Sequence, residues 1–262
     1  MTDIILQSHS LRKEFGALVA VDDVDMSIRQ NTLHSIIGPN GAGKTTFFNL
    51  LSGKYKPTGG RVMFKGQDIT DMPFHRRAHM GIGRSFQITN IFPNLTILEN
   101  VRLAAQAVSP QAFNFWGTVV HHKDLIDRAM HVLDIVGLAG DSLRLASVLP
   151  HGDKRKLELA ILLAPDPDVL LLDEPTAGMA SEQVPEIIGT IDNISKAHDK
   201  TVVMVEHNMS VVMGISDVIT VMDQGRLLAE GTPSEIANNK TVQDVYLGRL
   251  YGDADELIGK DA

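Results

Sequence analysis

The sequence predicts an α/β fold in which a largely parallel sheet is covered by helices on both faces. In the second half of the chain, helical patterns alternate with strands at 168–173 and 201–206 that are almost continuously apolar. Continuous apolar runs are typical of strands buried on both faces of a sheet. In the first half, the apolar strand "LHSIIG" at 33–38 leads through a glycine-rich turn into a helix at 44–51.

The other segments carry weaker patterns. Alternation typical of strands fills 4–37, and 56–69 is typical of a hairpin whose turn is Gly59-Gly60. The remaining elements are expected as helices at 94–106, 123–137, 154–164, 181–198 and 208–214, a strand-like segment at 218–231, and a last helix near 241–250. The helical stretch between the two α/β parts departs from a plain doubly wound fold.

Composition narrows the class of protein. The 262 residues are 44% hydrophobic, which is enough for a sizeable core, and the formal charge of −8 argues against a nucleic-acid binder. The basic clusters "HRRAH" at 75–79 and "KRK" at 154–156 are expected to be solvated helix faces. With no cysteine, no signal-peptide pattern and no apolar run of roughly 18–20 residues, the expectation is a soluble cytoplasmic protein.

The stretch "GPNGAGKTT" at 38–46 matches the phosphate-loop pattern G-x-x-x-x-G-K-[ST] and stands between a strand and a helix. Its glycines let backbone N–H groups surround phosphate oxygens at the positive end of the helix. Lys44 is expected to reach the β- and γ-phosphates, Thr45 to ligate Mg²⁺ and Thr46 to contact the α-phosphate. The expected nucleotide-binding set is Gly38, Pro39, Asn40, Gly41, Ala42, Gly43, Lys44, Thr45 and Thr46.

Two carboxylates, Asp173 and Glu174, end the apolar strand of "VLLLDEPTAG" at 169–178, at the edge where open α/β sheets bind ligands. Asp173 is expected to hold the hydration shell of Mg²⁺, and Glu174 to orient or deprotonate the attacking water. A guanine-specific GTPase is disfavoured because "NNKT" at 238–241 is not an Asn-Lys-x-Asp motif. A small-molecule kinase is disfavoured by this acidic pair and by His207 after the next strand.

With these motifs in place, residues 4–250 resemble the ATP-binding cassette (ABC) family. Phe15 in "KEFG" resembles the aromatic residue that stacks on adenine. Gln87 in "RSFQ" resembles the glutamine that contacts Mg²⁺ and senses the γ-phosphate, and His207 in "VVMVEH" resembles the histidine at the γ-phosphate. The resemblance implies hydrolysis of ATP with Mg²⁺, with a catalytic set of Glu174, His207, Lys44 and Gln87 and a metal set of Thr45, Gln87 and Asp173.

The same resemblance implies a fold: a phosphate-loop NTPase with a mixed-sheet core, an antiparallel β subdomain and a helical subdomain. A single cassette domain is expected over 4–250. Its parts are expected as a nucleotide-binding core at 1–87 and 161–235, a helical subdomain with the signature at 88–160, and a C-terminal helix and tail at 236–262.

Several stretches resemble one branch of the family, the ATPases of bacterial branched-chain amino acid importers and their relatives for urea, amides and organic acids. These stretches are "SFQITNIFPNLTILENV", "VEHNMSVVMGISDVITVMDQG", "EGTPSEI" and "VYLG". Such importers join two different ATPase chains to two membrane subunits and receive solute from a periplasmic binding protein. The resemblance therefore implies a peripheral location on the cytoplasmic face of the inner membrane, with 88–101 as the surface toward the membrane subunits.

Two other functions stay open at this point. ATPases of lipid or lipopolysaccharide extraction complexes resemble this branch of the family. A soluble ABC ATPase outside transport is the second alternative, although the sequence has neither the long coiled-coil insert of a DNA-maintenance ATPase nor the second cassette of a translation-type one.

The stretch "LPHGDKRKLELA" at 149–160 stands where the family has its Leu-Ser-Gly-Gly-Gln signature. In the family this motif contacts the γ-phosphate that is bound to the partner chain of a head-to-tail dimer. Here Pro150 replaces the serine, His151 replaces a glycine, Gly152 is kept and Asp153 replaces the glutamine. In a homodimer both sites would contain this signature, so the departure favours an unlike ATPase partner.

Overall fold

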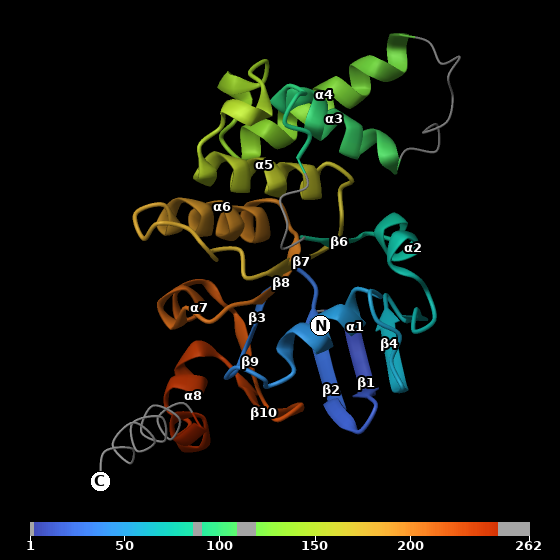
Figure 1. The fold of residues 1–262 in the computed structure, drawn as a ribbon, viewed down its shortest axis with the longest axis vertical. Coiled ribbons are helices and arrows are strands. Elements are labelled where there is room, and N and C mark those ends of the chain that lie inside the picture. Colours follow the sequence, from blue (N-terminus) through green and yellow to red (C-terminus); the bar gives the residue numbers. More distant parts are fainter. Residues whose placement is uncertain (1–2, 86–90, 109–118, 246–262) are drawn as a thin grey trace. The chain divides into compact units, whose positions relative to one another are not determined.

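The structure is a computed structural model that describes residues 3–85, 91–108 and 119–245. The chain divides into two compact units (Figure 1), which we call unit 1 (Met1–Asp71 with Val205–Ala262) and unit 2 (Met72–Met204). Unit 1 therefore combines the first part of the chain with the last, and unit 2 is one continuous segment.

Unit 1 contains an antiparallel sheet with the strand order β2-β1-β4-β5. Its strands are β1 (Ile4–Phe15), β2 (Leu18–Arg29), β4 (Gly59–Phe64) and β5 (Gln67–Asp68). The predicted turn at Gly59-Gly60 is wrong, because these glycines begin β4, in which Gly59 pairs with Arg12 of β1. The chain instead turns at Lys65-Gly66, where φ is 49° and 77°.

Three further strands of unit 1 have the order β10-β9-β3 and form a mixed arrangement. They are β3 (Leu33–Ile37), β9 (Val218–Asp223) and β10 (Arg226–Gly231). β3 runs parallel to β9, whereas β10 returns antiparallel to β9. β3 is buried along its whole length, and this includes the polar residues His34 and Ser35.

Helices cover these strands within unit 1. α1 (Lys44–Leu51) follows β3 with the bounds that the sequence predicts. α7 (Met209–Ile215) and α8 (Pro233–Ala237) pack on β3 and β9 through a buried cluster of Ile37, Val212, Ile219, Val221, Ile236 and Val242. The short α8 was not expected, and it begins with a capping box made by Thr232 and Glu235.

Unit 2 contains strands in the order β8-β7-β6. They are β6 (Ile82–Arg84), β7 (Val169–Asp173) and β8 (Thr201–Val205), whose residues as far as Met204 belong to this unit. β6 pairs parallel with β7. β7 and β8 are buried throughout, which confirms the two strands that the sequence predicts most strongly.

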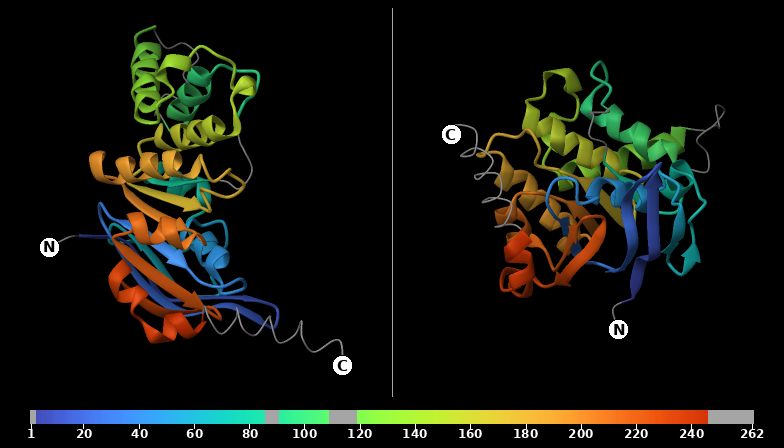
Figure 2. Two further views of the ribbon diagram at one scale, coloured as in Figure 1. Left: turned by 90° about the vertical axis from the view of Figure 1, so that its left-hand side faces the viewer. Right: turned by 60° about the horizontal axis from the view of Figure 1, so that its bottom comes forward.

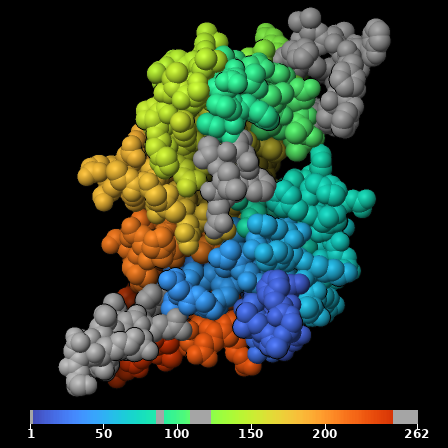
Figure 3. All heavy atoms as spheres, viewed as in Figure 1, coloured from blue at the N-terminus to red at the C-terminus, as the bar shows by residue number. Residues whose placement is uncertain are grey.

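The helices α3, α4 and α5 of unit 2 lie against one another in every view of Figures 1 and 2, with α6 beside α5. Their bounds are α3 (Ile97–Ala107), α4 (Val119–Ile135), α5 (His151–Leu163) and α6 (Val184–Ala197). Atoms of α3 and α4 form one continuous green surface in Figure 3. α3 begins later than predicted because the side chain of Thr96 accepts the N–H of Glu99 and caps the helix.

A short helix that the sequence did not predict, α2 (Phe74–His79), precedes β6. It contains the basic cluster at 75–79, and Arg77 in this cluster is 1% exposed, with its Nε donating to the carbonyl of Met72 at 2.9 Å. Lys156 in the second basic cluster is also buried. The prediction of fully solvated faces is therefore wrong for these two residues.

The described ranges contain no helix that combines the length and the apolar character needed to cross a membrane.

Candidate functional site

The phosphate loop of unit 1 joins β3 to α1, and its glycines adopt conformations that other residues cannot share. Gly38 and Gly43 have φ values of 154° and 94°. A Cβ on Gly38 would lie 2.2 Å from the carbonyl oxygen of Met222, and one on Gly43 would lie 2.4 Å from that of Ala20. The loop backbone therefore packs directly against neighbouring backbone, which only glycine permits.

Lys44 begins α1 and lies over this loop. Its Nζ donates to the carbonyl oxygens of Gly38 at 2.7 Å and Pro39 at 3.0 Å. No side chain caps the N-terminus of α1 at Gly43, and its first turn has no acidic residue. An uncapped helix start beside a lysine is suited to bind phosphate oxygens.

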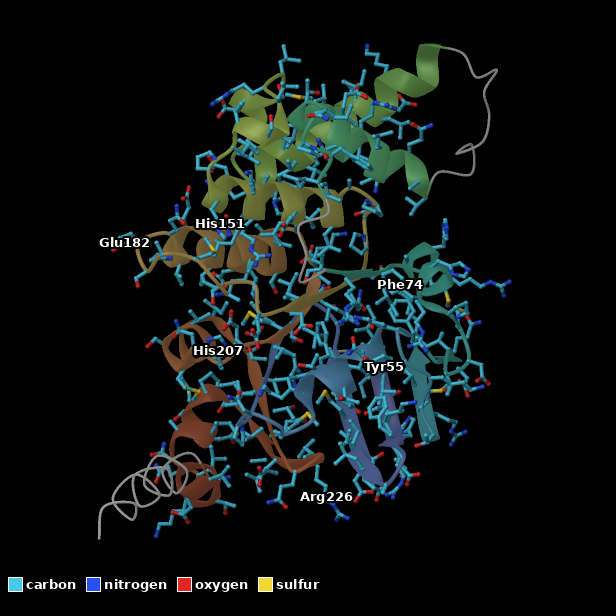
Figure 4. All side chains as sticks on the ribbon, in the orientation of Figure 1. Tyr55, Phe74, His151, Glu182, His207 and Arg226 are labelled. Carbon is cyan, nitrogen blue, oxygen red and sulfur yellow. The ribbon has the colours of Figure 1, made fainter. Side chains whose placement is uncertain are left out.

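Phe15 ends β1 of unit 1, and its side chain is 44% exposed. Its ring stands edge-on to Tyr55, with centroids 5.6 Å apart, and Nζ of Lys13 lies 5.1 Å from its centroid. Tyr55 follows α1 closely (Figure 4). The ring is thus supported on one side while much of it remains available for stacking, as adenine binding requires.

His207 is exposed and lies two residues before α7 (Figure 4). The next residue, Asn208, is the N-cap of α7, and its Oδ1 accepts the N–H groups of Ser210 and Val211. The preceding residue, Glu206, is completely buried. His207 therefore stands on a short segment whose two flanking residues are both fixed.

Asp173 and Glu174 follow each other at the end of β7 in unit 2. Asp173 is 7% exposed, its N–H donates to Oγ of Ser85 at 3.0 Å, and its Oδ2 lies 3.5 Å from Nη2 of Arg84. Glu174 is half-buried with a φ of 47°, and its carbonyl accepts the N–H of Ala177 at 3.0 Å. A glutamate in this left-handed region is strained, and such strain is concentrated at functional sites.

The segment at the signature position forms the start of α5 in unit 2. Pro150 is the N-cap of α5 and offers no side-chain hydrogen bond. A Cβ on Gly152 would lie 3.3 Å from Nε2 of Gln183, so this glycine is tightly covered. Figure 4 marks His151 at this helix start.

Lys156, one turn into α5, anchors this helix start. Its Nζ lies 2.5 Å from Oε1 of Glu186 and 3.3 Å from Oδ1 of Asp153. Burial lowers the pKa of Lys156, but the hydrogen bonds from Glu186 and Asp153 outweigh burial and raise the pKa above its usual value. The lysine therefore remains charged and offsets part of the negative charge that Asp153 brings.

An apolar cavity of about 290 Å³ lies in unit 2 between α2, β6, the end of α3 and α5. Its apolar wall includes Phe74, Ala78, Ile82, Ala104, Ile161 and Leu162. Arg84, Ser85 and Glu158 add polar groups to this lining. Ser85 and Glu158 also line a smaller cavity beside Asp173.

The predicted site residues fall in both units. Unit 1 holds the phosphate loop, Phe15 and His207, while unit 2 holds Asp173, Glu174 and Gly152. Gln87 lies outside the described residues. The sequence analysis did not identify Arg84, Ser85 or Lys156 as site residues. The only signal for Arg84 and Ser85 is that they directly precede the "FQ" of the "RSFQ" motif, and the only signal for Lys156 is that "KRK" lies in the helix that follows the signature position.

A glycine loop that only glycine can build, an uncapped helix behind it and a buried strand ending in two carboxylates define a phosphate-loop nucleotide-binding protein. Residues 21–177 match the family model described as ABC transporter. The chain therefore belongs to the ABC transporter family of ATP-binding proteins. Residues 226–250 also match a model described as branched-chain amino acid ATP-binding cassette transporter.

Individual relatives agree with this assignment. The chain is 40% identical over 254 residues to the high-affinity branched-chain amino acid transport ATP-binding protein LivG of Salmonella typhimurium, covering 95% of this chain and 99% of LivG. It is 30% identical to the lipopolysaccharide export system ATP-binding protein LptB of Haemophilus influenzae, covering 94% and 98%. A solved structure in the ADP conformation, MJ1267, an ATP-binding cassette of an ABC transporter, is 28% identical with a TM-score of 0.81, covering 94% and 100%.

Proposed function

We propose that the chain is the ATP-hydrolysing subunit of an importer for branched-chain amino acids or a related small organic solute. The observation that carries this proposal is the 40% identity to LivG over nearly the whole of both chains. The match of residues 226–250 to a branch-specific model supports the same solute class. In such an importer the chain acts at the cytoplasmic face of the inner membrane.

The phosphate loop binds the nucleotide in this proposal. The N–H groups of 38–46 surround the phosphates, Lys44 moves from the loop carbonyls to the β- and γ-phosphates, and Thr46 contacts the α-phosphate. Phe15 stacks on the adenine. Any Cβ at Gly38 or Gly43 would clash with neighbouring backbone. This close approach of backbone to the loop supports its role in binding phosphate.

The donor set of the chain fits Mg²⁺, which prefers oxygen ligands and keeps several waters. The Thr45 hydroxyl, the Gln87 amide oxygen and the Asp173 carboxylate are the residues that would hold it. Thr45 is exposed in the first turn of α1, and Asp173 lies at the end of β7 with its main-chain N–H donating to Oγ of Ser85. When bound, Mg²⁺ supplies positive charge at the phosphate oxygens.

Glu174 acts on the attacking water, accepting its proton while His207, Lys44 and Gln87 position and stabilise the γ-phosphate. The left-handed φ of 47° at Glu174 turns the backbone out of the course of a regular strand at this residue. Hydrolysis in this scheme depends on positioning and charge rather than on a covalent intermediate.

A second ATPase chain completes the site in this proposal. The two chains associate head to tail, and the α5 start with Gly152 faces the γ-phosphate that is bound to the partner. Because Pro150 has neither hydroxyl nor N–H, this chain offers the partner's nucleotide fewer hydrogen bonds. The partner is therefore an unlike chain with a more complete signature, and the site at this chain's own phosphate loop is the stronger one.

Two membrane subunits receive the motion of the ATPases, and a periplasmic binding protein supplies the solute. We assign the apolar cavity of unit 2 as the place where a helix of a membrane subunit docks, because its lining of Phe74, Ile82 and Ile161 fits an apolar helix face. Phe92, within the predicted surface at 88–101, is 57% exposed and so is available for a partner at that surface, whereas Ile97 is buried in the core.

Cross-linking tests the docking assignment cleanly because the chain has no cysteine of its own. Single variants Phe74→Cys and Val108→Cys, at the cavity, are expected to cross-link to a membrane subunit in the intact complex. Leu143→Cys, which is 79% exposed elsewhere in unit 2, is the control and should not. Cross-linking from Leu143→Cys alone would contradict the assignment.

Deletion of the gene tests the function. Cells that lack the chain are expected to lose high-affinity uptake of radiolabelled leucine, and the wild-type gene should restore it whereas Glu174→Gln should not. The 30% identity to LptB makes lipopolysaccharide export the second candidate function. Normal leucine uptake together with defective lipopolysaccharide delivery would favour that function and contradict the importer.

A further inference from the structure

Glu206 is a buried acidic residue to which the proposed mechanism gives no role. It follows β8 and is 0% exposed, yet it directly precedes the exposed His207. Its Oε2 accepts the N–H of His207 at 3.1 Å and the N–H of Asn208 at 3.4 Å. The carboxylate thus folds back on the backbone of the two residues that follow it.

The backbone of Glu206 is joined to the strand that leads into the phosphate loop. Its N–H donates to the carbonyl oxygen of Ile36 at 3.4 Å. Ile36 lies in β3 and is completely buried, two residues before Gly38. All these residues belong to unit 1, so the carboxylate, the phosphate-loop strand and His207 form one connected local structure.

Burying a carboxylate costs free energy, which is unusual for a residue whose only role is structural. Removing its charge from water is unfavourable unless hydrogen bonds compensate it. The N–H groups of His207 and Asn208 both point at the Glu206 carboxylate and supply such hydrogen bonds, at 3.1 Å and 3.4 Å. The same contacts tie the peptide groups of these two residues to the carboxylate.

We propose that Glu206 is a positioning residue that fixes the backbone of His207 and thereby aims its imidazole at the γ-phosphate. This inference rests on the role proposed above for His207. Asn208 fixes the other side of the segment by capping α7. The Asn208 cap accepts the N–H groups of Ser210 and Val211, whereas the Glu206 carboxylate accepts the N–H of His207 itself. The carboxylate therefore sets the position of the His207 backbone from which the imidazole side chain extends.

A double-mutant cycle tests this inference in the intact transporter complex. Glu206→Met keeps a similar volume but removes the acceptor, and it is compared with Glu206→Gln in the wild-type and His207→Ala backgrounds. Because a displacement of about 1 Å can cost about 100-fold in rate, Glu206→Met is expected to lower kcat about 10- to 100-fold with little change in the Kd for ATP. Glu206→Gln keeps an acceptor oxygen and should retain most of the activity.

The cycle separates positioning from general stability. If Glu206 acts through His207, Glu206→Met should cause no further loss of kcat in the His207→Ala background. Thr232→Ala is the matched control, because it removes the capping box of α8 in the same unit but keeps both hydrogen bonds to the carboxylate. It is expected to lower the melting temperature as Glu206→Met does while leaving kcat closer to wild type.

Three results would overturn the inference: equal losses of kcat in both backgrounds, a loss of ATP binding as large as the loss of kcat, or an equal loss of kcat from Thr232→Ala. If His207→Ala leaves kcat unchanged, the role proposed for His207 fails and the inference falls with it. Should Glu206→Met not fold, Glu206→Asp carries the same test, since it keeps the charge but shortens the reach to the N–H of His207.

Discussion

Nη2 of Arg84 lies 3.5 Å from Oδ2 of Asp173, and the two side chains are 5% and 2% exposed. Arg84 also lines the apolar cavity of unit 2. A single buried guanidinium therefore contacts both the carboxylate proposed for Mg²⁺ and the surface proposed for the membrane subunit. Arg84 lies three positions before Gln87 in the sequence.

Replacing Arg84 should destabilise the protein strongly. Arg84→Met leaves the buried carboxylate of Asp173 without this cation, and breaking a buried pair costs about 3–5 kcal/mol. Urea denaturation measures the loss in the free energy of unfolding. The exposed pair of Arg144 and Asp141 is the control, since Arg144→Met should cost less than about 1 kcal/mol. Equal losses in the free energy of unfolding of the two variants would show that burial does not make the Arg84–Asp173 pair more important for stability than an exposed pair.

Replacing Lys44 should weaken nucleotide binding. Lys44→Ala removes a cation whose hydrogen bonds to phosphate are each worth about 1.5–3 kcal/mol, so the Kd for ATP should rise about tenfold or more. A fluorescent ATP analogue measures binding to the purified chain. Lys54→Ala, which removes a lysine beyond the end of α1, is the control. Unchanged affinity in Lys44→Ala would count against the phosphate-loop assignment.

Replacing Glu174 should separate binding from hydrolysis. Glu174→Gln keeps the size of the side chain but cannot accept the proton of water, so kcat should fall about 100-fold or more while ATP still binds. The variant should accumulate an ATP-bound closed dimer, which size-exclusion chromatography detects. Glu182→Gln, an exposed glutamate of the same unit (Figure 4), should hydrolyse ATP normally. Near-normal hydrolysis by Glu174→Gln in the assembled complex would exclude Glu174 as the base.

Strong local signals made part of this fold predictable. α1 has the predicted bounds because glycines stop the strand before it and a breaker-free run follows. β7 and β8 were predictable because strands buried on both faces are continuously apolar. α2 was missed because a helix this short shows too little hydrophobic periodicity. The turn predicted at Gly59-Gly60 was wrong because a pair of glycines can also begin a strand where neighbouring backbone lies too close for a side chain.

Contacts between distant segments explain what the sequence could not reveal about the site. The phosphate loop, Asp173 and Glu174 follow local patterns of residue type and spacing. Arg84 pairs with a carboxylate 89 positions away and Lys156 with one 30 positions away. No local pattern marks such partners, because only the packing of the strands and helices brings them within reach.

The buried histidine of β3 should make stability depend on pH. His34 donates from Nε2 to Oγ1 of Thr220 at 2.7 Å, because the Thr220 hydroxyl itself donates to Glu230. Burial lowers the pKa of His34 to about 4, against about 6.5 in the unfolded chain. The folded state therefore binds this proton more weakly, and stability is fully present above about pH 6.5 and is lost as the pH falls toward about 4.

The loss that His34 causes should approach about 3 kcal/mol, since each pKa unit corresponds to about 1.4 kcal/mol. Urea denaturation between about pH 7.5 and about pH 4.5 measures it. His34→Gln keeps an N–H donor toward Thr220 but does not titrate, so its stability should fall less steeply over this range. Parallel curves for the two proteins would exclude His34 as the source.

The start of α5 should make this chain a poor ATPase by itself. In a homodimer both nucleotides would face Pro150, which has no N–H to donate, and Asp153, whose charge Lys156 offsets only in part at 3.3 Å. Mixed with the unlike ATPase chain, its own phosphate loop would face a more complete signature. ATP hydrolysis should therefore be low for the lone chain and rise several-fold on mixing.

Restoring the signature isolates the cause of this asymmetry. The double variant Pro150→Ser and Asp153→Gln returns a hydroxyl and an N–H and removes a negative charge near the phosphate. Each hydrogen bond to a charged group contributes about 1.5–3 kcal/mol, so hydrolysis by the lone chain should increase about tenfold or more. Glu182→Gln, which removes a negative charge from an exposed position of the same unit and leaves the start of α5 unaltered, is the control for a general effect of substitution in this unit. Full activity of the unmodified lone chain would show that Pro150 and Asp153 do not weaken the site, because backbone N–H groups farther along α5 would then suffice to hold the phosphate.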